Sequence, residues 1–453
     1  MIYDLYTPEG EALTGVPWPD YPRPRLRRDS FLNLNGPWEF TARPEGDLPA
    51  AYGQTIQVPF CPESLLSGVH AHFPEGWYLF YRRRFTLPEG FVKSRVLLQI
   101  GAADQILDAW LNGRYMGSHT GGYEHMTFEV TAALAAENEL VLRVRDDLRG
   151  NRLPYGKQTM QRGGMWYTPV SGIWQTVWME SVPDRYIRRL DIRADGARAL
   201  MDAGDETLDG TVTVRTPDGV LTVPLERGRA EIAPPAPRLW SPEDPYLYEC
   251  TVQAGEDRVE SYFALRTVEI RQVGGHARIC LNGEPCFFHG VLDQGYYSDG
   301  LFTPASPACY ERDIRAMQAL GFNTLRKHIK VEPDIFYTLC DRLGMVVFQD
   351  MVNNGNYRYL RDTVLPTAGW QRRRSDERLH RDPAARAAFL AGMEATVDQL
   401  KNHPCILYWT IFNEGWGQFS SSDAYRRLKK LDDSRIIDST SGWFRGGETD
   451  VDS

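Results

Sequence analysis

The sequence lacks the features that mark secreted and membrane-spanning proteins. Its 453 residues contain only 7 cysteines, scattered along the chain and never spaced as Cys-x-x-Cys. This usage predicts free thiols in a reducing compartment and no cysteine-bound zinc. No run of about 18 apolar residues occurs, and the first residues show neither the cationic head nor the apolar segment of a signal peptide. We therefore expect a cytoplasmic protein without a membrane partner.

The sequence also has fewer basic than acidic residues. The chain has 51 Lys and Arg against 60 Asp and Glu, which gives a net charge of −9. Without a basic surplus, nucleic acid and anionic lipid are poor partners, and a neutral or weakly charged substrate fits better. The sequence has no internal repeat, Gly-rich phosphate loop, metal-binding His pair or nucleophile elbow. We therefore assign no cofactor and no metal.

Aromatic residues, by contrast, are abundant in a long chain. The length predicts about three domains, and the 42% hydrophobic content supports ordinary globular cores. Aromatic residues make up 12% of the chain, including 12 Trp and 22 Tyr. Their flat apolar faces suit stacking on sugar rings as well as core packing, although each one taken alone fits a core better.

Two blocks of short strands are predicted in the first part of the chain. From about residue 25 to residue 183, apolar and polar residues alternate between frequent glycines, and Asn112-Gly113 is a strong hairpin signal after Ile106–Leu111. The residues Ile173–Glu180 predict another strand. The segment 184–272 alternates in the same way and has the length of an immunoglobulin-like sandwich. We expect two antiparallel β-sandwiches in succession.

The pattern changes after a second hairpin signal at Asn282-Gly283, where short buried strands begin to alternate with amphipathic helices. The predicted strands are Phe287–Leu292, Asn323–Arg326, Met345–Gln349, Ile406–Phe412 and Arg435–Ser439, and the helices lie near 308–320, 333–343, 384–401 and 422–431. Such alternation predicts a parallel sheet with right-handed crossovers. An eight-stranded barrel takes about 250 residues, and roughly 180 remain after Gly275. The pattern therefore extends only through about the fifth strand.

One of these strand signals ends in chemically useful residues. The near-continuous apolar run Cys405–Phe412 is followed by Asn413, Glu414 and then Gly415-Trp416-Gly417. Apolar runs without alternation suit parallel strands covered on both faces, and the chemistry of barrels lies where such strands end. Glu414 is therefore a candidate catalytic acid, with Asn413 as its substrate-orienting neighbour. The alternative is that Glu414 only caps the next helix or pairs with an arginine.

These residues resemble glycoside hydrolase family 2, the family of β-galactosidases, β-glucuronidases and β-mannosidases, over nearly the whole chain. The motifs that carry the resemblance are Leu34–Phe40, Trp110–Gly113, Gly117–Tyr123, Ser171–Gln175, Leu239–Tyr248, Gly321–His328 and Asn402–Trp416. The resemblance implies a multidomain β plus α/β protein. Its expected parts are a jelly-roll sugar-binding-like domain over 1–183, an immunoglobulin-like β-sandwich over 184–274, and part of a catalytic (β/α)₈ TIM barrel over 275–453.

The resemblance also implies an activity, the retaining exo-hydrolysis of a terminal β-linked sugar from a carbohydrate substrate. Glu414 would be the general acid/base, which requires a pKa raised by burial near Trp409 or Trp416. A retaining enzyme needs a second carboxylate about 5 to 5.5 Å away as nucleophile. In the family this is a glutamate at the end of the seventh strand, beyond Ser453. We therefore expect this chain alone to be inactive.

Polar residues at the other strand ends complete the expected site. By the resemblance, Arg326 ends the second strand beneath the nucleophile. Asp350 ends the third strand and Asp293 follows the first, and we interpret both as substrate-binding or structural. For His328, a hydrogen-bonded core position is as good an interpretation as a substrate contact. The full predicted substrate-binding set is Asn413, Arg326, His328, Asp293, Asp350, Trp416 and Trp443.

Two further functions stay open on the sequence. The first is a non-catalytic carbohydrate-binding or scaffolding protein, which the missing nucleophile favours and Glu414 disfavours. The second and weaker one is a structural array of β-sandwiches in which the aromatic residues only fill cores. The segment Val291–Tyr297 departs from the common galactosidase and glucuronidase patterns, so the sugar and its linkage stay open. A second copy of the chain, forming a homo-oligomer, is the one protein partner we consider.

Overall fold

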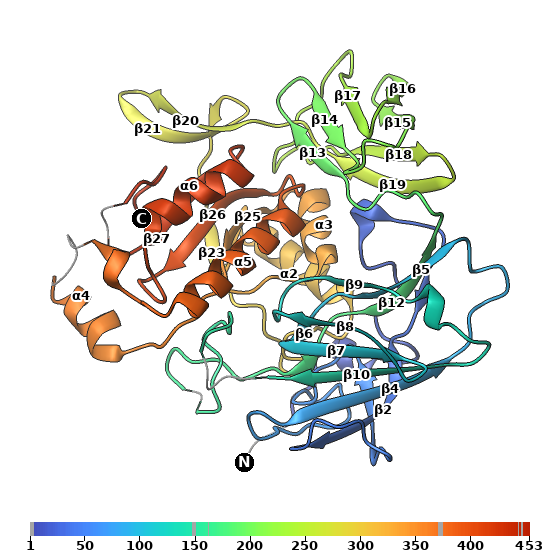
Figure 1. Ribbon diagram of the computed structural model, residues 1–453. Coiled ribbons are helices and arrows are strands. Elements are labelled where there is room, and N and C mark those ends of the chain that lie inside the picture. The colour runs from blue at the N-terminus through green and yellow to red at the C-terminus, as the bar shows by residue number, and fades with distance from the viewer. Residues whose placement is uncertain (1–3, 147–150, 162, 370–374, 443, 445–446) are drawn as a thin grey trace.

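The protein has three blocks, which a computed structural model describes over residues 4–146, 151–161, 163–369, 375–442, 444 and 447–453. Figure 1 shows a blue-to-teal β block, a green β block above it, and an orange-to-red block in which helices surround parallel strands. Among the described residues, no helix has the length and apolar character needed to span a bilayer.

The first block consists mainly of two antiparallel sheets. One has the order β1-β12-β5-β9, with bounds Leu32–Asn33, Val177–Val182, Arg95–Ile100 and Met126–Glu129. The other has the order β3-β2-β4-β10-β7-β8, with bounds Gln54–Val58, Gly36–Arg43, Tyr78–Phe85, Asn138–Arg145, Ile106–Leu111 and Arg114–Thr120. In β10, the alternating residues Leu140, Leu142 and Val144 are fully buried because successive side chains of a strand point to opposite faces. The predicted antiparallel sheets are therefore present.

The predicted turn of this block is confirmed, but one predicted strand is wrong. Asn112 and Gly113 have φ values of 52° and 76°, as a tight turn between β7 and β8 requires. The segment Ile173–Glu180 is not one strand, because pairing stops at the end of β11 (Gly172–Ile173, paired with β6, Ala103–Asp104) and resumes at β12. Between the two, the buried Trp174 packs into the core of the third block. The strand pairing is interrupted at Trp174, because the ring of this residue lies in a core that the first and third blocks share.

The second block is a smaller pair of antiparallel sheets. Its sheets have the orders β13-β14-β17 (Asp191–Ala194, Ala199–Asp202, Arg229–Ile232) and β16-β15-β18-β19 (Gly219–Leu225, Gly210–Thr216, Tyr248–Ala254, Asp257–Phe263). A three-stranded sheet follows, with the order β20-β21-β22 (Val268–Val273, His276–Leu281, Glu284–Pro285). Its predicted turn at Asn282-Gly283 is confirmed, and Figure 1 shows β20 and β21 projecting from the molecule.

The third block is a row of five parallel strands, as predicted. The order is β23-β24-β25-β26-β27, with bounds Gly290–Asp293, Thr324–Lys327, Val346–Asp350, Ile406–Asn413 and Ile436–Ser441. The helices between them are α2 (Pro307–Ala319), α3 (Asp334–Leu343), α4 (Leu365–Thr367), α5 (Pro383–Leu400) and α6 (Ser421–Leu431). Strand β23 starts later than predicted, since its pairing begins where Gly290 meets Thr324, and Phe287 is 82% exposed. Within the described residues, β23 and β27 each pair with one strand.

Strand β26 is buried along its whole length. All eight of its residues are buried between β25 and β27. On one side Phe412 stacks on Phe389 of α5, with ring centroids 4.8 Å apart. The apolar residues of β26 follow one another without alternation because both faces of the strand are covered, as predicted.

Buried hydrogen bonds fix the second block against the third. The guanidinium of Arg266 donates to the backbone carbonyls of Pro404 and Ile406, at 2.7 and 2.9 Å. The hydroxyl of Tyr262 donates to a carboxylate oxygen of Asp341 at 2.8 Å. The carbonyls of Pro404 and Ile406 lie at the start of β26, and Asp341 of α3 also accepts from the backbone N–H of Cys405 there, so these contacts position the strand that carries Asn413.

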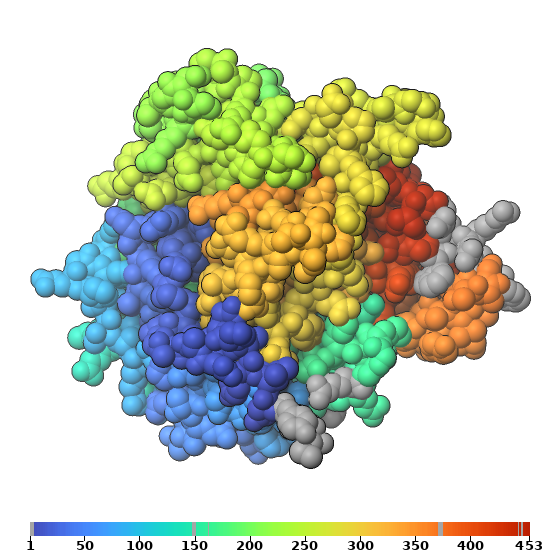
Figure 2. Space-filling model, turned by 180° about the vertical axis from the view of Figure 1, so that it is seen from behind, coloured from blue at the N-terminus to red at the C-terminus, as the bar shows by residue number. Residues whose placement is uncertain are grey.

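The N-terminal segment is fixed on the third block. Thr7 donates through its backbone N–H and its hydroxyl to Asp299, at 2.9 and 2.6 Å, and the indole of Trp18 donates to the carbonyl of Pro304 at 2.9 Å. Figure 2 shows this dark-blue segment lying against the yellow-to-orange part of the chain. The segment also contains the short helices α1 (Pro8–Glu11) and η1 (Pro24–Leu26).

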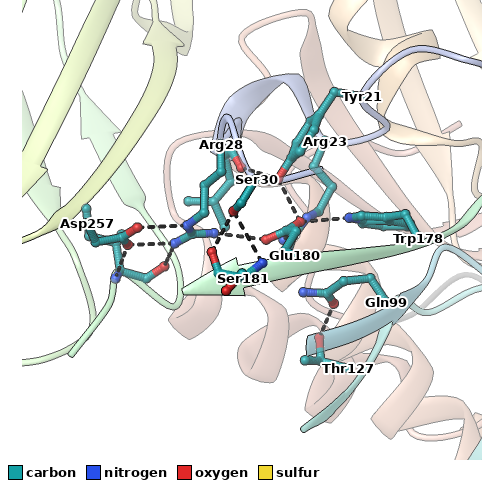
Figure 3. A network of polar contacts seen from close by, with 12 residues as sticks. Tyr21, Arg23, Arg28, Ser30, Gln99, Thr127, Trp178, Glu180, Ser181 and Asp257 are labelled. Atoms are coloured by element: carbon teal, nitrogen blue, oxygen red, sulfur yellow. Dashed lines mark hydrogen bonds and ion pairs between the residues drawn. The ribbon is translucent and has the colours of Figure 1, made fainter. Parts of the chain in front are cut away.

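A buried ion cluster joins this segment to both β-sandwiches (Figure 3). Arg28 donates to Asp257 at 2.8 and 3.0 Å and to Glu180 at 3.1 Å, and Arg23 donates to Glu180 at 2.7 Å. The side chains of Arg28, Glu180 and Asp257 are at most 2% exposed. Burial alone would raise the pKa of Glu180, but the two guanidinium charges outweigh burial and lower that pKa to about 2. The cluster is therefore ionised at neutral pH.

Candidate active site

Strand β24 sends its side chains alternately to two sides, and this separates the polar residues around it. Arg326 and His328 lie on one side, toward Asp350 at the end of β25. Lys327 lies on the other side, where it contacts Asp293 and Glu332 at 2.7 and 2.8 Å. The alternation of a strand thus produces one charged cluster at the strand ends and a second one behind the sheet.

Arg326 joins the ends of the four strands β24 to β27. It donates to Asp350 at 3.0 Å, to the side-chain carbonyl of Asn413 at 2.9 Å and to the hydroxyl of Ser441 at 3.3 Å. Burial would lower the pKa of Arg326, but the charge of Asp350 outweighs burial and raises it. The guanidinium is therefore a fixed positive charge that orients the Asn413 amide.

A chain of polar contacts connects this group to the first block. The Nδ1 atom of His328 lies 2.9 Å from the buried Asp350 carboxylate, and its Nε2 lies 3.3 Å from Nζ of Lys157. Since Asp350 accepts a hydrogen bond from Nδ1, Nε2 is left as the acceptor for the lysine. Burial lowers the pKa of Lys157, opposed by the charges of Glu414 and Asp350. Lys157 thus loses its proton at a lower pH than an exposed lysine does.

Glu414 lies directly after β26, beside Lys157. Its backbone has φ of +50°, a left-handed conformation that is strained for this residue type, and its N–H donates to the Ser441 carbonyl at 2.7 Å. One carboxylate oxygen lies 3.9 Å from Nζ of Lys157. The predicted burial of Glu414 near Trp409 or Trp416 is wrong, because the side chain is 59% exposed. The indole of Trp409 instead donates to Asp432.

The two tryptophans of the predicted set have different outcomes. Trp416 lies next to the strand-end group, with Nζ of Lys157 5.5 Å from its ring centroid. The rings of Trp166 and Tyr357, with centroids 4.9 and 4.5 Å away, cover it and leave it 2% exposed. Trp443 lies outside the described residues. The aromatic surface beside Glu414 is therefore built by several rings, and Trp416 is its buried member.

Asp293 does not join the other predicted site residues. Its register partner in the neighbouring strand is Lys327, so both side chains lie on the same side of the sheet. The carboxylate accepts from Lys327 and from the backbone N–H of Gly295. We therefore correct its assignment from substrate binding to the charged cluster behind the sheet.

Sequence reasoning missed the contribution of the first block, the segment 151–168. Lys157, Trp166 and Tyr167 of this segment all lie against strand-end residues, and the ring centroid of Tyr167 is 6.3 Å from that of His328. Gly156 is required there, because a Cβ would lie 3.0 Å from the carbonyl of Ile329. A signal was present: a connection of more than 20 residues between β10 and β11 is unusually long, and such connections are often functional.

The strand-end group is suited to proton transfer and to binding hydroxyl groups. It combines an exposed carboxylate on Glu414, two cationic side chains and an oriented amide on Asn413. The amide nitrogen of Asn413 is buried and has no hydrogen-bond partner among the described residues, so it is a free donor. Over the same residues, no three His, Cys, Asp or Glu side chains are arranged to hold a metal ion.

Two family models match this architecture. The model "Glycosyl hydrolases family 2, TIM barrel domain" matches residues 272–451, which include all five parallel strands and Glu414. The model "Glycosyl hydrolases family 2" matches residues 195–266 in the second block. The chain belongs to glycosyl hydrolases family 2. The family resemblance inferred from the sequence motifs is thereby confirmed.

Curated relatives of this family 2 chain include two bacterial proteins named β-galactosidase. The protein from Aeromonas hydrophila is 30% identical over 466 aligned positions, and that from Vibrio cholerae is 27% identical over 406. These alignments cover 93% and 82% of the family 2 chain. The chain spans 41% and 37% of the length of these relatives.

A solved structure supports the fold of the family 2 chain. The β-glucuronidase from an uncultured Clostridium species matches it with a TM-score of 0.74, over 93% of this chain and 74% of its own length. The sequence identity is 19%, so the likeness concerns the fold alone. It agrees with the order of two β blocks followed by parallel strands with helices.

Proposed function

We propose that the protein containing this chain is a glycoside hydrolase that removes a terminal β-linked sugar with retention, and that Glu414 is its general acid/base. The observation that carries the proposal is the meeting of an exposed carboxylate, the Asn413 amide and two cations at the carboxyl ends of parallel strands. In barrels of this kind the active site occupies that face. The names of the curated relatives and of the solved structure favour a β-galactoside or a β-glucuronide as substrate.

Each neighbour of Glu414 has a role in the proposed reaction. The free amide donor of Asn413 would bind a substrate hydroxyl, since its carbonyl is occupied by Arg326. The ammonium of Lys157 would orient the Glu414 carboxylate by electrostatic attraction. The lysine is itself positioned by its contact with His328, which in turn contacts Asp350. Exposure of Glu414 lets it reach the leaving-group oxygen, and a bound sugar would cover the carboxyl and so favour the protonated form that donates the proton.

The nucleophile is proposed to lie outside residues 1–453. Among the carboxylates at the described strand ends, Asp350 is buried and accepts from both Arg326 and His328, and Asp293 lies behind the sheet. Neither carboxylate is free to attack a sugar carbon. With the domains 1–183 and 184–274 as jelly-roll and immunoglobulin-like supports, 275–453 would form the barrel part that carries the acid/base.

Hydrolysis of a panel of 4-nitrophenyl β-glycosides tests this proposal. The whole protein should release 4-nitrophenol from the β-galactoside or the β-glucuronide, and proton NMR should show the β-anomer as the first product, because retention requires two displacements. Residues 1–453 alone should give no release above the uncatalysed rate. An α-anomer as first product would contradict retention. Binding of the sugars by the whole protein without any hydrolysis would favour a non-catalytic carbohydrate-binding protein.

Replacing Lys157 by methionine should reduce kcat/KM of the whole protein by roughly tenfold to a hundredfold, the cost of a lost hydrogen bond to a charged group. Because the pKa of Lys157 is lowered, wild-type activity should decline on the alkaline side before an ordinary lysine would titrate. This alkaline decline should be absent in Lys157→Met. The pH dependence of kcat/KM for both proteins measures the effect.

The matched control is Lys93→Met, which removes a lysine from the surface of the same block. Lys93 is 38% exposed, and among the described residues its ammonium pairs only with the exposed Asp29. Its replacement should leave kcat/KM unchanged, together with the decline of activity at alkaline pH. If this alkaline decline were retained in Lys157→Met, another group would be the one that titrates there.

A further inference from the structure

A cavity of about 320 Å³ lies where the three blocks and the N-terminal segment meet. We call it the junction cavity. Its walls include Arg23 of the N-terminal segment, Trp178 of β12, Leu190 of the second block, and Asp334 and Gln399 of the third block. This volume lies within the range of small-molecule binding sites, which occur preferentially at such interfaces between domains.

The junction cavity is separate from the strand-end site. None of the residues that line it is Lys157, Arg326, His328, Asn413 or Glu414. Its lining residues on the third block are Thr303, the beginnings of α2 and α3, the last two turns of α5 and Asn402, all outside the row of strands. A molecule in this cavity would therefore leave the proposed active site open.

Several buried polar atoms of the lining residues have no hydrogen-bond partner among the described residues. Arg23 Nε and Gln175 Nε2 are donors, and Asp334 Oδ2 is an acceptor. The Nε2 atom of His125 is also unpartnered. Burial and then the charge of Arg23 lower the pKa of His125 to about 3, so the neutral ring can donate or accept. Gln175 itself is only 6% exposed, which makes its unpaired amide costly.

The charged residues that line the junction cavity include both signs, and most of them are paired within the protein. Arg23 pairs with Glu180 at 2.7 Å and Arg25 with Asp334 at 3.1 Å. Further pairs are Arg189 with Asp191, at 3.3 Å, and Asp398 with Lys401, at 2.7 Å, and the lining also holds Asp20, Glu124 and Arg188. A ligand with a net charge would face a partner of like sign as well as one of opposite sign. Mixed free donors and acceptors, by contrast, match hydroxyl groups, each of which both donates and accepts. The indole of Trp178 and the ring of His125, with centroids 5.3 Å apart, add flat apolar surface.

We propose that the junction cavity is a second binding site, for an uncharged molecule of monosaccharide size that is rich in hydroxyl groups. A bound molecule would contact the N-terminal segment and all three blocks at once. The proposal does not depend on the hydrolase activity, because it uses none of the strand-end residues.

Ligand-detected NMR titration with D-glucose tests the proposal. The wild-type protein should bind D-glucose, and Ala395→Leu should weaken binding at least tenfold, because Ala395 lines the cavity from α5 and a larger side chain would fill it. Gln175→Leu, which removes a free donor at similar volume, should weaken binding about tenfold. D-glucuronate should bind at least tenfold more weakly than D-glucose.

The matched control is Ala387→Leu, an exposed position on the same helix that does not line the cavity, and it should bind as the wild type does. Asn413→Ala separates the two sites, and binding should persist in it. Binding that is lost in Asn413→Ala but kept in Ala395→Leu would assign the sugar to the strand-end site and overturn the proposal. Absence of binding to the wild type, or equal binding of D-glucuronate, would also overturn it. Failure of the hydrolysis assay would leave all these titrations unaffected.

Discussion

Replacing Glu414 by glutamine in the whole protein should lower kcat for an alkyl β-glycoside by about 10² to 10⁴, the usual contribution of general acid catalysis. Glutamine keeps the size of the side chain and its place beside Lys157 but cannot donate a proton to the leaving oxygen. An aryl glycoside with a good leaving group needs no such proton, so its first step should lose far less. The values of kcat/KM for methyl and 4-nitrophenyl glycosides of the same sugar, which report the first step alone, measure the difference.

Glu256→Gln is the control for this experiment, because Glu256 lies exposed in the turn between β18 and β19. It should leave both rates unchanged. Equal losses on the alkyl and aryl substrates in Glu414→Gln would argue against an acid role. A small loss of activity on both substrates would indicate that Glu414 is a carboxylate that only pairs with the neighbouring lysine.

Replacing Arg28 by alanine should destabilise the protein by about 3–5 kcal/mol, the cost of breaking a buried ion pair on one side. The change leaves the carboxylates of Asp257 and Glu180, which are 1% and 0% exposed, without the guanidinium that they share. The cluster joins the N-terminal segment to both sandwiches, so the first urea transition should occur at a lower concentration. Tryptophan fluorescence reports this transition, since Trp178 donates to Glu180.

The effect should depend on pH in a defined direction. Because the pKa of Glu180 is lowered in the folded protein, its ion pairs contribute fully above the ordinary carboxylate range and are lost as the pH falls toward about 2. The difference between Arg28→Ala and the wild type should therefore shrink in acid. Arg84→Ala is the control, because Arg84 and its partner Glu139 are 64% and 40% exposed, and such pairs contribute about 0 to 1 kcal/mol. A shift no larger than that of this control would contradict the assigned role of the cluster.

Much of the architecture follows from local sequence patterns. The alternation in β10, the turn residues Asn112-Gly113 and the apolar run of β26 each have a local cause, namely a pleated strand, a positive φ and cover on both faces. The sequence correctly predicts these three features. It does not predict the interrupted strand near Trp174, because the cause of the interruption is a contact with a core formed by residues far along the chain.

For the candidate site, the sequence by itself determined that Asn413, Glu414, Arg326 and Asp350 lie at the ends of parallel strands, because strand ends can be read from hydrophobic runs. Only the tertiary structure decided the rest. The register of β23 against β24 turned Asp293 to the back of the sheet, and a long connection from the first block placed Lys157 beside Glu414. The junction cavity needs four parts of the chain. Such features depend on how separate elements pack in space, and this packing leaves no periodic signal in the sequence.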